Sequence, residues 1–192
     1  GELLVGSLGN AILSGQTGLT VSGNAVAVGS SSSFAFLLSS SDLTILATTT
    51  FVMVNGESLL QAAGTVRIGE TSYGVGTPVS IGFGGRLQAR AVTIMALADI
   101  TLNTVAWNVQ QTVSVAARGS LTIAGGTIVS EGTSIALLAD VDGNGAGDVT
   151  VNGGATITSP KNSPARIEGW GVFISSDARI SPVPVTVVRS TL

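Results

Sequence analysis

The chain has 192 residues and a net charge of -3, and 44% of its residues are hydrophobic, 10% charged and 4% aromatic. There is no basic cluster, so nucleic-acid binding is not expected. There is no continuous apolar stretch of about 18 residues, so insertion into a membrane as a helix is not expected either. The sequence lacks cysteine and histidine, which excludes disulfides, thiolate metal sites and Ser-His or Cys-His nucleophiles. The many Gly, Ser, Thr, Ala and Val residues favour closely packed, repetitive strands.

The first segment in chain order, residues 1–18, is apolar but out of phase with the repeat that follows it. Its apolar side chains are those of Leu3, Leu4, Val5, Leu8, Ile12 and Leu13. An extended apolar segment exposed to water is an aggregation hazard. Adding it to the sheet edge of another chain would satisfy its backbone and bury its side chains, so we expect it to act as a strand between subunits. The alternative is that it folds back as the first coil and caps its own rod.

A three-residue phrase, in which Thr or Arg lies between two apolar residues, recurs over residues 19–180. Its copies begin at Leu19, Leu43, Val66, Val92, Leu121, Val149 and Ala178. Successive copies are separated by 24, 23, 26, 29, 28 and 29 residues, and near-constant spacing in this range is typical of a solenoid. A β-sandwich, which also consists of short strands separated by turns, is the alternative fold.

Each period divides into three short strands separated by tight turns. After Leu121-Thr122-Ile123, for example, come the strand-like residues 127–130 and 134–138, with glycines at the corners. Three strands per period close one triangular coil, and such coils stack through parallel pairing about 4.8 Å apart. We predict an all-β fold, a parallel β-helix (β-solenoid) of about seven coils of roughly 23–29 residues over residues 19–180.

The alternation within the phrase predicts which side chains face the core. We expect one inward column, formed by Leu19, Leu43, Val66, Val92, Leu121 and Val149. We expect one outward column, formed by Thr20, Thr44, Arg67, Thr93, Thr122, Thr150 and Arg179. The C-terminal residues 181–192 contain Pro182 and Pro184, which cannot donate to a ladder, so we expect an edge strand or an extended tail there.

Three stretches share the pattern of this repeat: ADITLN at residues 98–103, SLTIAGGTI at residues 120–128 and DVTVNGGATI at residues 148–157. They resemble the repeats of filamentous-haemagglutinin-type proteins, a group that includes secreted bacterial exoproteins and autotransporter passengers. The resemblance covers roughly residues 19 to 180. It implies a right-handed parallel β-helix outside a bacterial cell that serves adhesion or surface structure.

The segment ADVDGNGAGDVTV, residues 139–151, has the oxygen-rich first half of a calcium-binding loop. Side-chain oxygens occupy relative positions 1, 3, 5 and 9, in Asp140, Asp142, Asn144 and Asp148, and Gly145 occupies position 6. Position 12 is Val151, where such a loop requires a bidentate glutamate. The alternative is a plain turn between two coils. A calcium ion bound there would clamp the loop, which is a structural role.

The acidic residues are distributed over separate corners of the predicted coils. A glycosidase needs two carboxylates that face each other across a substrate groove, and Asp140 and Asp142 lie in a loop without neighbouring aromatic residues to hold a sugar. We therefore expect no catalytic residues and no cofactor other than a structural calcium ion. Trp107 and Trp170 are interpreted as cap or edge contacts, because an indole is large for a slim coil, and ligand platforms are the alternative.

Both termini are apolar, whereas the ends of a solenoid are normally covered by polar or helical caps. We therefore expect a non-catalytic extracellular structural protein that assembles with itself, end to end or by strand exchange, into a filament, sheath or surface fibre. Its partners would be further copies and the surface of a host or neighbouring cell. One alternative is a fragment of a bacterial adhesin stalk whose neighbouring coils supply the caps. Another is a carbohydrate-active β-helix enzyme.

Overall fold

Short runs of alternating apolar and polar residues form 22 β-strands and no helix among the residues that the computed structural model describes. Those residues are 2–6, 10–30, 33–69, 77–160, 162–163, 165–182 and 186–189. The strands pair in parallel from one turn of the chain to the next, so the fold is the predicted β-solenoid, with about seven turns. Because the described residues form no helix, none of them could cross a membrane as one.

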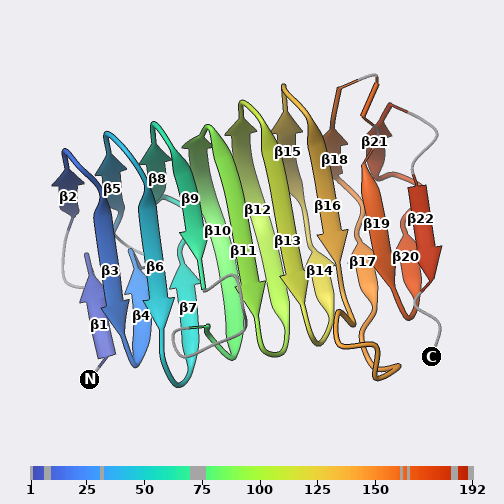
Figure 1. The fold of residues 1–192 in the computed structure, drawn as a ribbon, viewed down its shortest axis with the longest axis horizontal. Helices are drawn as coiled ribbons and strands as arrows, with labels where there is room; N and C mark the ends of the chain where they lie inside the picture. The colour runs from blue at the N-terminus through green and yellow to red at the C-terminus, as the bar shows by residue number, and fades with distance from the viewer. Residues whose placement is uncertain are drawn as a thin grey trace.

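The winding chain builds three faces (Figure 1). The first face contains β1 (Glu2–Val5), β4 (Ala25–Val28), β7 (Phe51–Val54), the first parts of β10 (Ser80–Ala89) and β12 (Ile100–Val109), β14 (Leu121–Ile123), β17 (Val149–Val151) and β20 (Val172–Ile174). The second face contains β2 (Ala11–Gly15), β5 (Ala35–Ser39), β8 (Leu59–Ala62), the second parts of β10 and β12, β15 (Gly126–Ser130), β18 (Ala155–Thr158) and β21 (Arg179–Ser181). The third face contains β3 (Leu19–Gly23), β6 (Leu43–Ala47), β9 (Thr65–Ile68), β11 (Ala91–Ala96), β13 (Thr112–Ala117), β16 (Ser134–Leu138), β19 (Arg166–Gly169) and β22 (Thr186–Arg189).

Strands β10 and β12 run around the corner between the first two faces and join them into one 14-stranded sheet, whereas the third face is a separate 8-stranded sheet. Gly85 permits the bend in β10, because its φ of 114° favours glycine and a Cβ there would lie 2.9 Å from the carbonyl oxygen of Ser58. The register shifts at this corner, since Phe83 pairs with Leu102 but Gly85 pairs with Val105. The extra residue in β12 lets it follow the bend of β10.

Successive coils stack residue on residue, so each inward position continues as a column through the rod. On the second face one such column runs through Leu13, Leu37, Leu60, Leu87, Trp107, Ile128, Ile157 and Ile180. The members between the two ends are at most 2% exposed. The core is therefore a set of stacked apolar columns inside a triangle and not a layer between two facing sheets.

The inward column predicted from the repeated phrase is correct for its first four members and wrong after them. Val92 on β11 pairs with Val113 on β13, 21 residues later, and not with Leu121. Leu121 and Val149 instead stack on Ile100 on the first face. Copies of the phrase therefore lie on different faces of the rod. This is possible because every face requires the same alternation of inward and outward residues.

The predicted outward column is likewise distributed over all three faces. Its first four members stack on the third face as expected, whereas Thr122 and Thr150 lie on the first face and Arg179 lies on the second. Coil length also varies more than predicted. It ranges from 19 residues between the paired Ile81 and Ile100 of the first face to 30 residues between Leu137 and Ile167 of the third face.

The described part of residues 1–18 forms the first coil of its own chain, which is the alternative arrangement given for this segment. Strand β1 pairs with β4, and β2 pairs with β5. At the other end β22 pairs with β19, so residues 186–189 form an edge strand of the third face. Contact between the N-terminal segment and a second chain stays a prediction.

Substitution of Leu121 tests the assignment of inward and outward positions. Leu121 is fully buried, so Leu121→Asp would place an unpaired charge in the core and lower the free energy of unfolding by several kcal/mol. Thr122→Asp changes the neighbouring, half-buried outward position of the same strand, and we expect a loss below about 1 kcal/mol. Urea denaturation measures both variants, and equal losses would contradict the assignment.

Candidate functional site

At the N-terminal end of the rod, β1, β2 and β3 have a paired neighbour on one side only among the described strands. Apolar side chains gather there, since Leu4, Ile12 and Leu13 are 50%, 63% and 39% exposed. Leu13 belongs to an inward column, and Leu37, with which it pairs, is fully buried. Leu13 is therefore exposed because no further coil covers it.

The other residues predicted to mediate assembly are less accessible. Leu3 is half-buried and packs against the core, and Val5 is buried. Leu8 lies outside the described residues. The accessible part of the predicted assembly surface is therefore the outer side of β1 together with β2.

The C-terminal end of the rod also has strands with one open edge and exposed apolar side chains. Strands β20, β21 and β22 each pair on one side only among the described strands. Phe173 and Ile174 are 59% and 41% exposed, although Val151, which pairs with Ile174 one coil earlier, is buried. An inward residue is therefore open to solvent at this end too.

The two ends present opposite edges of the same parallel sheets, because the columns run through the whole rod. The ends lie at opposite extremes of its long axis (Figure 1). If a second rod continued the stack in the same register, Phe173 of one copy would lie next to Leu4 of the other, and Ile180 next to Leu13. A contact between two different surfaces of identical chains is head to tail, and it builds an open filament when the rotation does not close a ring.

Three aspartates link successive coils at the corners. Each lies immediately before a strand, and its Oδ1 accepts a hydrogen bond of 2.7 Å from a backbone N–H one coil further on. The pairs are Asp42 with Thr65, Asp99 with Ser120 and Asp148 with Gly171. Each carboxylate thereby satisfies a backbone donor at a corner, where the ladder between strands is interrupted.

A glycine accompanies each of these carboxylates in the next coil. A Cβ at Gly64, Gly119 or Gly171 would lie 2.2, 2.3 or 2.6 Å from the carboxylate oxygen, so a larger residue would displace the aspartate. The sequence signal is an aspartate directly before the repeated phrase, but only the stacking identifies its partner. Asp177 also directly precedes a copy of the phrase, but it lies at the corner between β20 and β21, where its carboxylate accepts a hydrogen bond from the Ser175 hydroxyl that lowers its pKa.

The acidic loop, residues 139–148, forms the corner between β16 and β17. Asp140 is 3% exposed, and its Oδ1 accepts a backbone hydrogen bond from within the loop. Asp142 and Asn144 are exposed neighbours, with Asn144 Nδ2 3.2 Å from Asp142 Oδ2, whereas Asp148 is turned away to its corner hydrogen bond. No three acidic side chains gather as a metal site in the part of the chain that the structure describes. Calcium binding by all four predicted residues stays a prediction.

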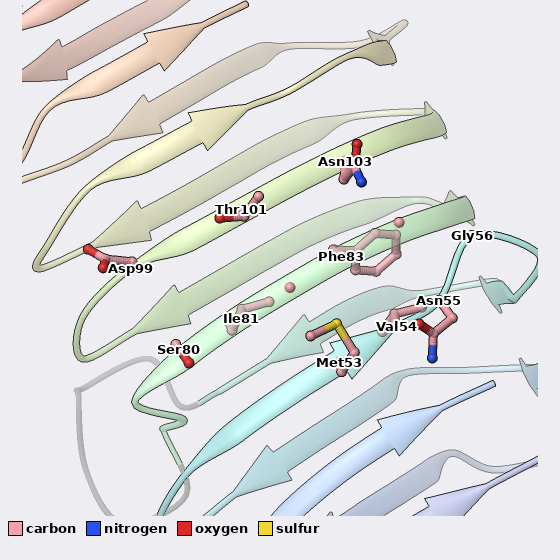
Figure 2. A pocket seen from close by; sticks show the side chains of 12 residues that line it. Met53, Val54, Asn55, Gly56, Ser80, Ile81, Phe83, Asp99, Thr101 and Asn103 are labelled. Atoms are coloured by element: carbon pink, nitrogen blue, oxygen red, sulfur yellow. The ribbon is translucent and has the colours of Figure 1, made fainter. Parts of the chain in front are cut away.

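A shallow groove of about 480 Å³ lies on the outer side of the first face (Figure 2). Gly82 has no side chain between the outward positions of Met53 on β7 and Thr101 on β12, and a Cβ there would lie 2.7 Å from the Met53 sulfur. Asp99 is the one carboxylate among the described residues that line the groove. The groove therefore lacks the facing carboxylate pair of a glycosidase, and the expectation that the protein is not an enzyme stays a prediction.

Trp107 lies inside the rod, so its interpretation as a cap or edge contact is wrong. It is 2% exposed and packs edge-on against Phe83, with ring centroids 5.1 Å apart and ring planes at 82°. Its neighbours along the column, Leu87 and Ile128, are smaller, so the interior of the stack accommodates one indole between aliphatic residues. Trp170 is exposed near the C-terminal end, as expected for an edge residue.

No protein-family model, no curated protein and no solved structure matches the chain. The resemblance to filamentous-haemagglutinin-type repeats is therefore supported at the level of the β-solenoid fold, which the structure shows. Membership of that group of proteins stays a prediction.

Substitution of Asp99 tests the corner hydrogen bonds. Asp99→Ala removes the acceptor of the Ser120 N–H, and we expect the free energy of unfolding to fall by about 1 kcal/mol. Asp99→Asn keeps an oxygen acceptor and should lose less. Glu57→Ala, at another exposed corner, is the matched control and should change stability by less than about 0.5 kcal/mol. Equal stability of the two alanine variants in chemical denaturation would contradict the role assigned to Asp99.

Proposed function

We propose that this chain is a non-catalytic structural protein whose solenoid extends end to end, through further copies, into a filament, sheath or surface fibre. One observation carries the proposal, which is that an inward column is open at each end of the rod, the column of Leu13 in the first coil and the column of Ile174 in the last. Between the ends, the members of these two columns are buried. A further coil at either end would bury the exposed side chains and pair the open strand edges.

The proposed contact is head to tail. The edge formed by β20, β21 and β22 of one copy meets the edge formed by β1, β2 and β3 of the next, so that each copy uses two different surfaces. The exposed Phe173 and Leu4 would then cover each other on the outer side of the first face. The partner of this protein is therefore a second copy of itself, and growth continues at both free ends.

We place the assembly outside a bacterial cell or at its surface, where it could also contact a host or neighbouring cell. The resemblance of residues 98–103, 120–128 and 148–157 to haemagglutinin-type repeats supports this location. The alternative function is a length of a bacterial adhesin stalk. The same open ends favour it, because coils of a longer polypeptide would cover them as well as a second copy would.

Lysine substitutions at the two ends test the assembly. Leu13→Lys and Ile174→Lys each place a charge where the next coil would dock, so neither variant should form fibres in negative-stain electron microscopy. Val79→Lys is the matched control, because Val79 is 41% exposed, as Ile174 is, but lies at a corner within the rod. This control should form fibres as the unsubstituted chain does.

A mixture of the two end variants distinguishes head-to-tail stacking from other modes. Each variant keeps one competent end, so an equimolar mixture of Leu13→Lys and Ile174→Lys should contain paired rods and nothing longer in analytical ultracentrifugation. Fibres formed by either variant alone, or by the mixture, would contradict stacking through these ends. Single rods formed by the unsubstituted chain would contradict self-assembly and favour the adhesin stalk.

A further inference from the structure

The acidic loop enlarges one corner of the solenoid. Ten residues, 139–148, separate β16 from β17, whereas three residues, 118–120, separate β13 from β14 at the same corner one coil earlier. The added residues concentrate negative charge, since they include three aspartates and an asparagine. A plain turn between two strands does not require this length or this charge.

Asp140 is a buried carboxylate that lacks a partner for one of its oxygens. The residue is 3% exposed, and its Oδ2 has no hydrogen-bond partner. Its Oδ1 accepts a hydrogen bond of 3.2 Å from the Gly145 N–H, so the carboxyl group is directed into the loop. Burial of a carboxylate with an unsatisfied oxygen is costly, and a bound cation removes that cost by supplying both charge and coordination.

Two further side chains of the same loop, those of Asp142 and Asn144, carry oxygen ligands and are exposed. Asn144 Nδ2 is 3.2 Å from Asp142 Oδ2, so the two exposed side chains are in contact. Gly145, which donates to Asp140, has a φ of 79° and makes the sharp turn that calcium loops require at position 6. The Asn144 Oδ1 accepts the Ala146 N–H at 2.9 Å, which folds the chain back over the loop.

We propose that this loop binds one calcium ion through mixed oxygen ligands. The ligands are the free Oδ2 of Asp140, the side-chain oxygens of Asp142 and Asn144, and the backbone carbonyl of Ala146, which has the position-7 place of a calcium loop, with water completing the shell. Calcium accepts carboxylate, amide and backbone oxygens in flexible geometry, so the site needs only two carboxylates. We leave Asp148 out of this ligand set, because its Oδ1 accepts the hydrogen bond from the Gly171 N–H in the next coil.

The ion has a structural role that does not depend on the proposed filament. It neutralises the buried Asp140 and fixes the enlarged corner against the rod. We expect weak binding, with a Kd on the order of 10⁻⁴ to 10⁻³ M, because Val151 stands where a tight loop has a bidentate glutamate.

Calorimetric titration of the EDTA-treated 192-residue chain with calcium chloride tests the site. We expect one ion per chain in the affinity range given above. Asp142→Asn changes an exposed side chain and should leave the fold intact while weakening binding about tenfold or more. Asp177→Asn removes the same charge from an exposed position in another corner and is the matched control. It should bind calcium as the unsubstituted chain does.

Asp140→Asn separates the buried ligand from its neighbours, and circular dichroism shows whether this variant folds. A folded Asp140→Asn chain should bind no calcium, and its melting temperature should not respond to chelator. Absence of binding by the unsubstituted chain at about 10 mM calcium, which exceeds the range of extracellular calcium modules, would overturn the proposal. Equal affinity of the Asp142→Asn and Asp177→Asn variants would overturn it as well.

Discussion

A coil of this rod can bury its apolar residues only if the coils on both sides place similar residues at the same positions. This constraint of parallel, in-register stacking determines both how side chains pack in the core and how the backbone N–H and C=O groups find hydrogen-bond partners. Pairing between coils satisfies the backbone along the strands, and alternation directs every second side chain into the core. Where the ladder is interrupted at a corner, Asp99 supplies the missing acceptor, and Gly119 leaves room for it. Hydrogen bonding between successive coils therefore continues at some of the turns as well as along the strands.

The near-constant spacing of the repeated phrase is sufficient to predict the solenoid but not the face on which each strand lies. Val92 and Leu121 begin equivalent phrases, yet they belong to different faces, because each face imposes the same requirement on its side chains. The lengths of the intervening turns decide which face a phrase reaches, and those turns carry no comparable pattern. The burial of Trp107 was not predictable for a related reason. The space available to a side chain inside the rod depends on the residues that the neighbouring coils stack against it.

The candidate sites show which properties follow from spacing and which follow from stacking. The spacing places Asp140, Asp142, Asn144 and Asp148 in one loop. Contacts with the neighbouring coils give these side chains different roles. Asp148 is bound to the coil that follows, whereas Asp140 is buried and keeps an oxygen free. The N-terminal segment is a second example. Composition marks it as apolar, but only the structure shows that Leu13 is exposed whereas Val5, which also begins an inward column, is buried.

The position of the two ends at opposite extremes of the rod has a mechanical consequence (Figure 1). Hydrogen bonds between coils run along the rod axis, so tension applied through the ends acts across every coil boundary, and we expect the terminal coil, which pairs on one side only, to open first. A coil such as that from Leu19 to Leu43, with 24 residues, releases roughly 80 Å of extended chain while shortening the rod by about 4.8 Å. We therefore expect the protein to lengthen under load in steps of one coil, and Asp42, Asp99 and Asp148 to add resistance at the three coil boundaries that they link. Such a rod absorbs mechanical work gradually and does not break at a single point.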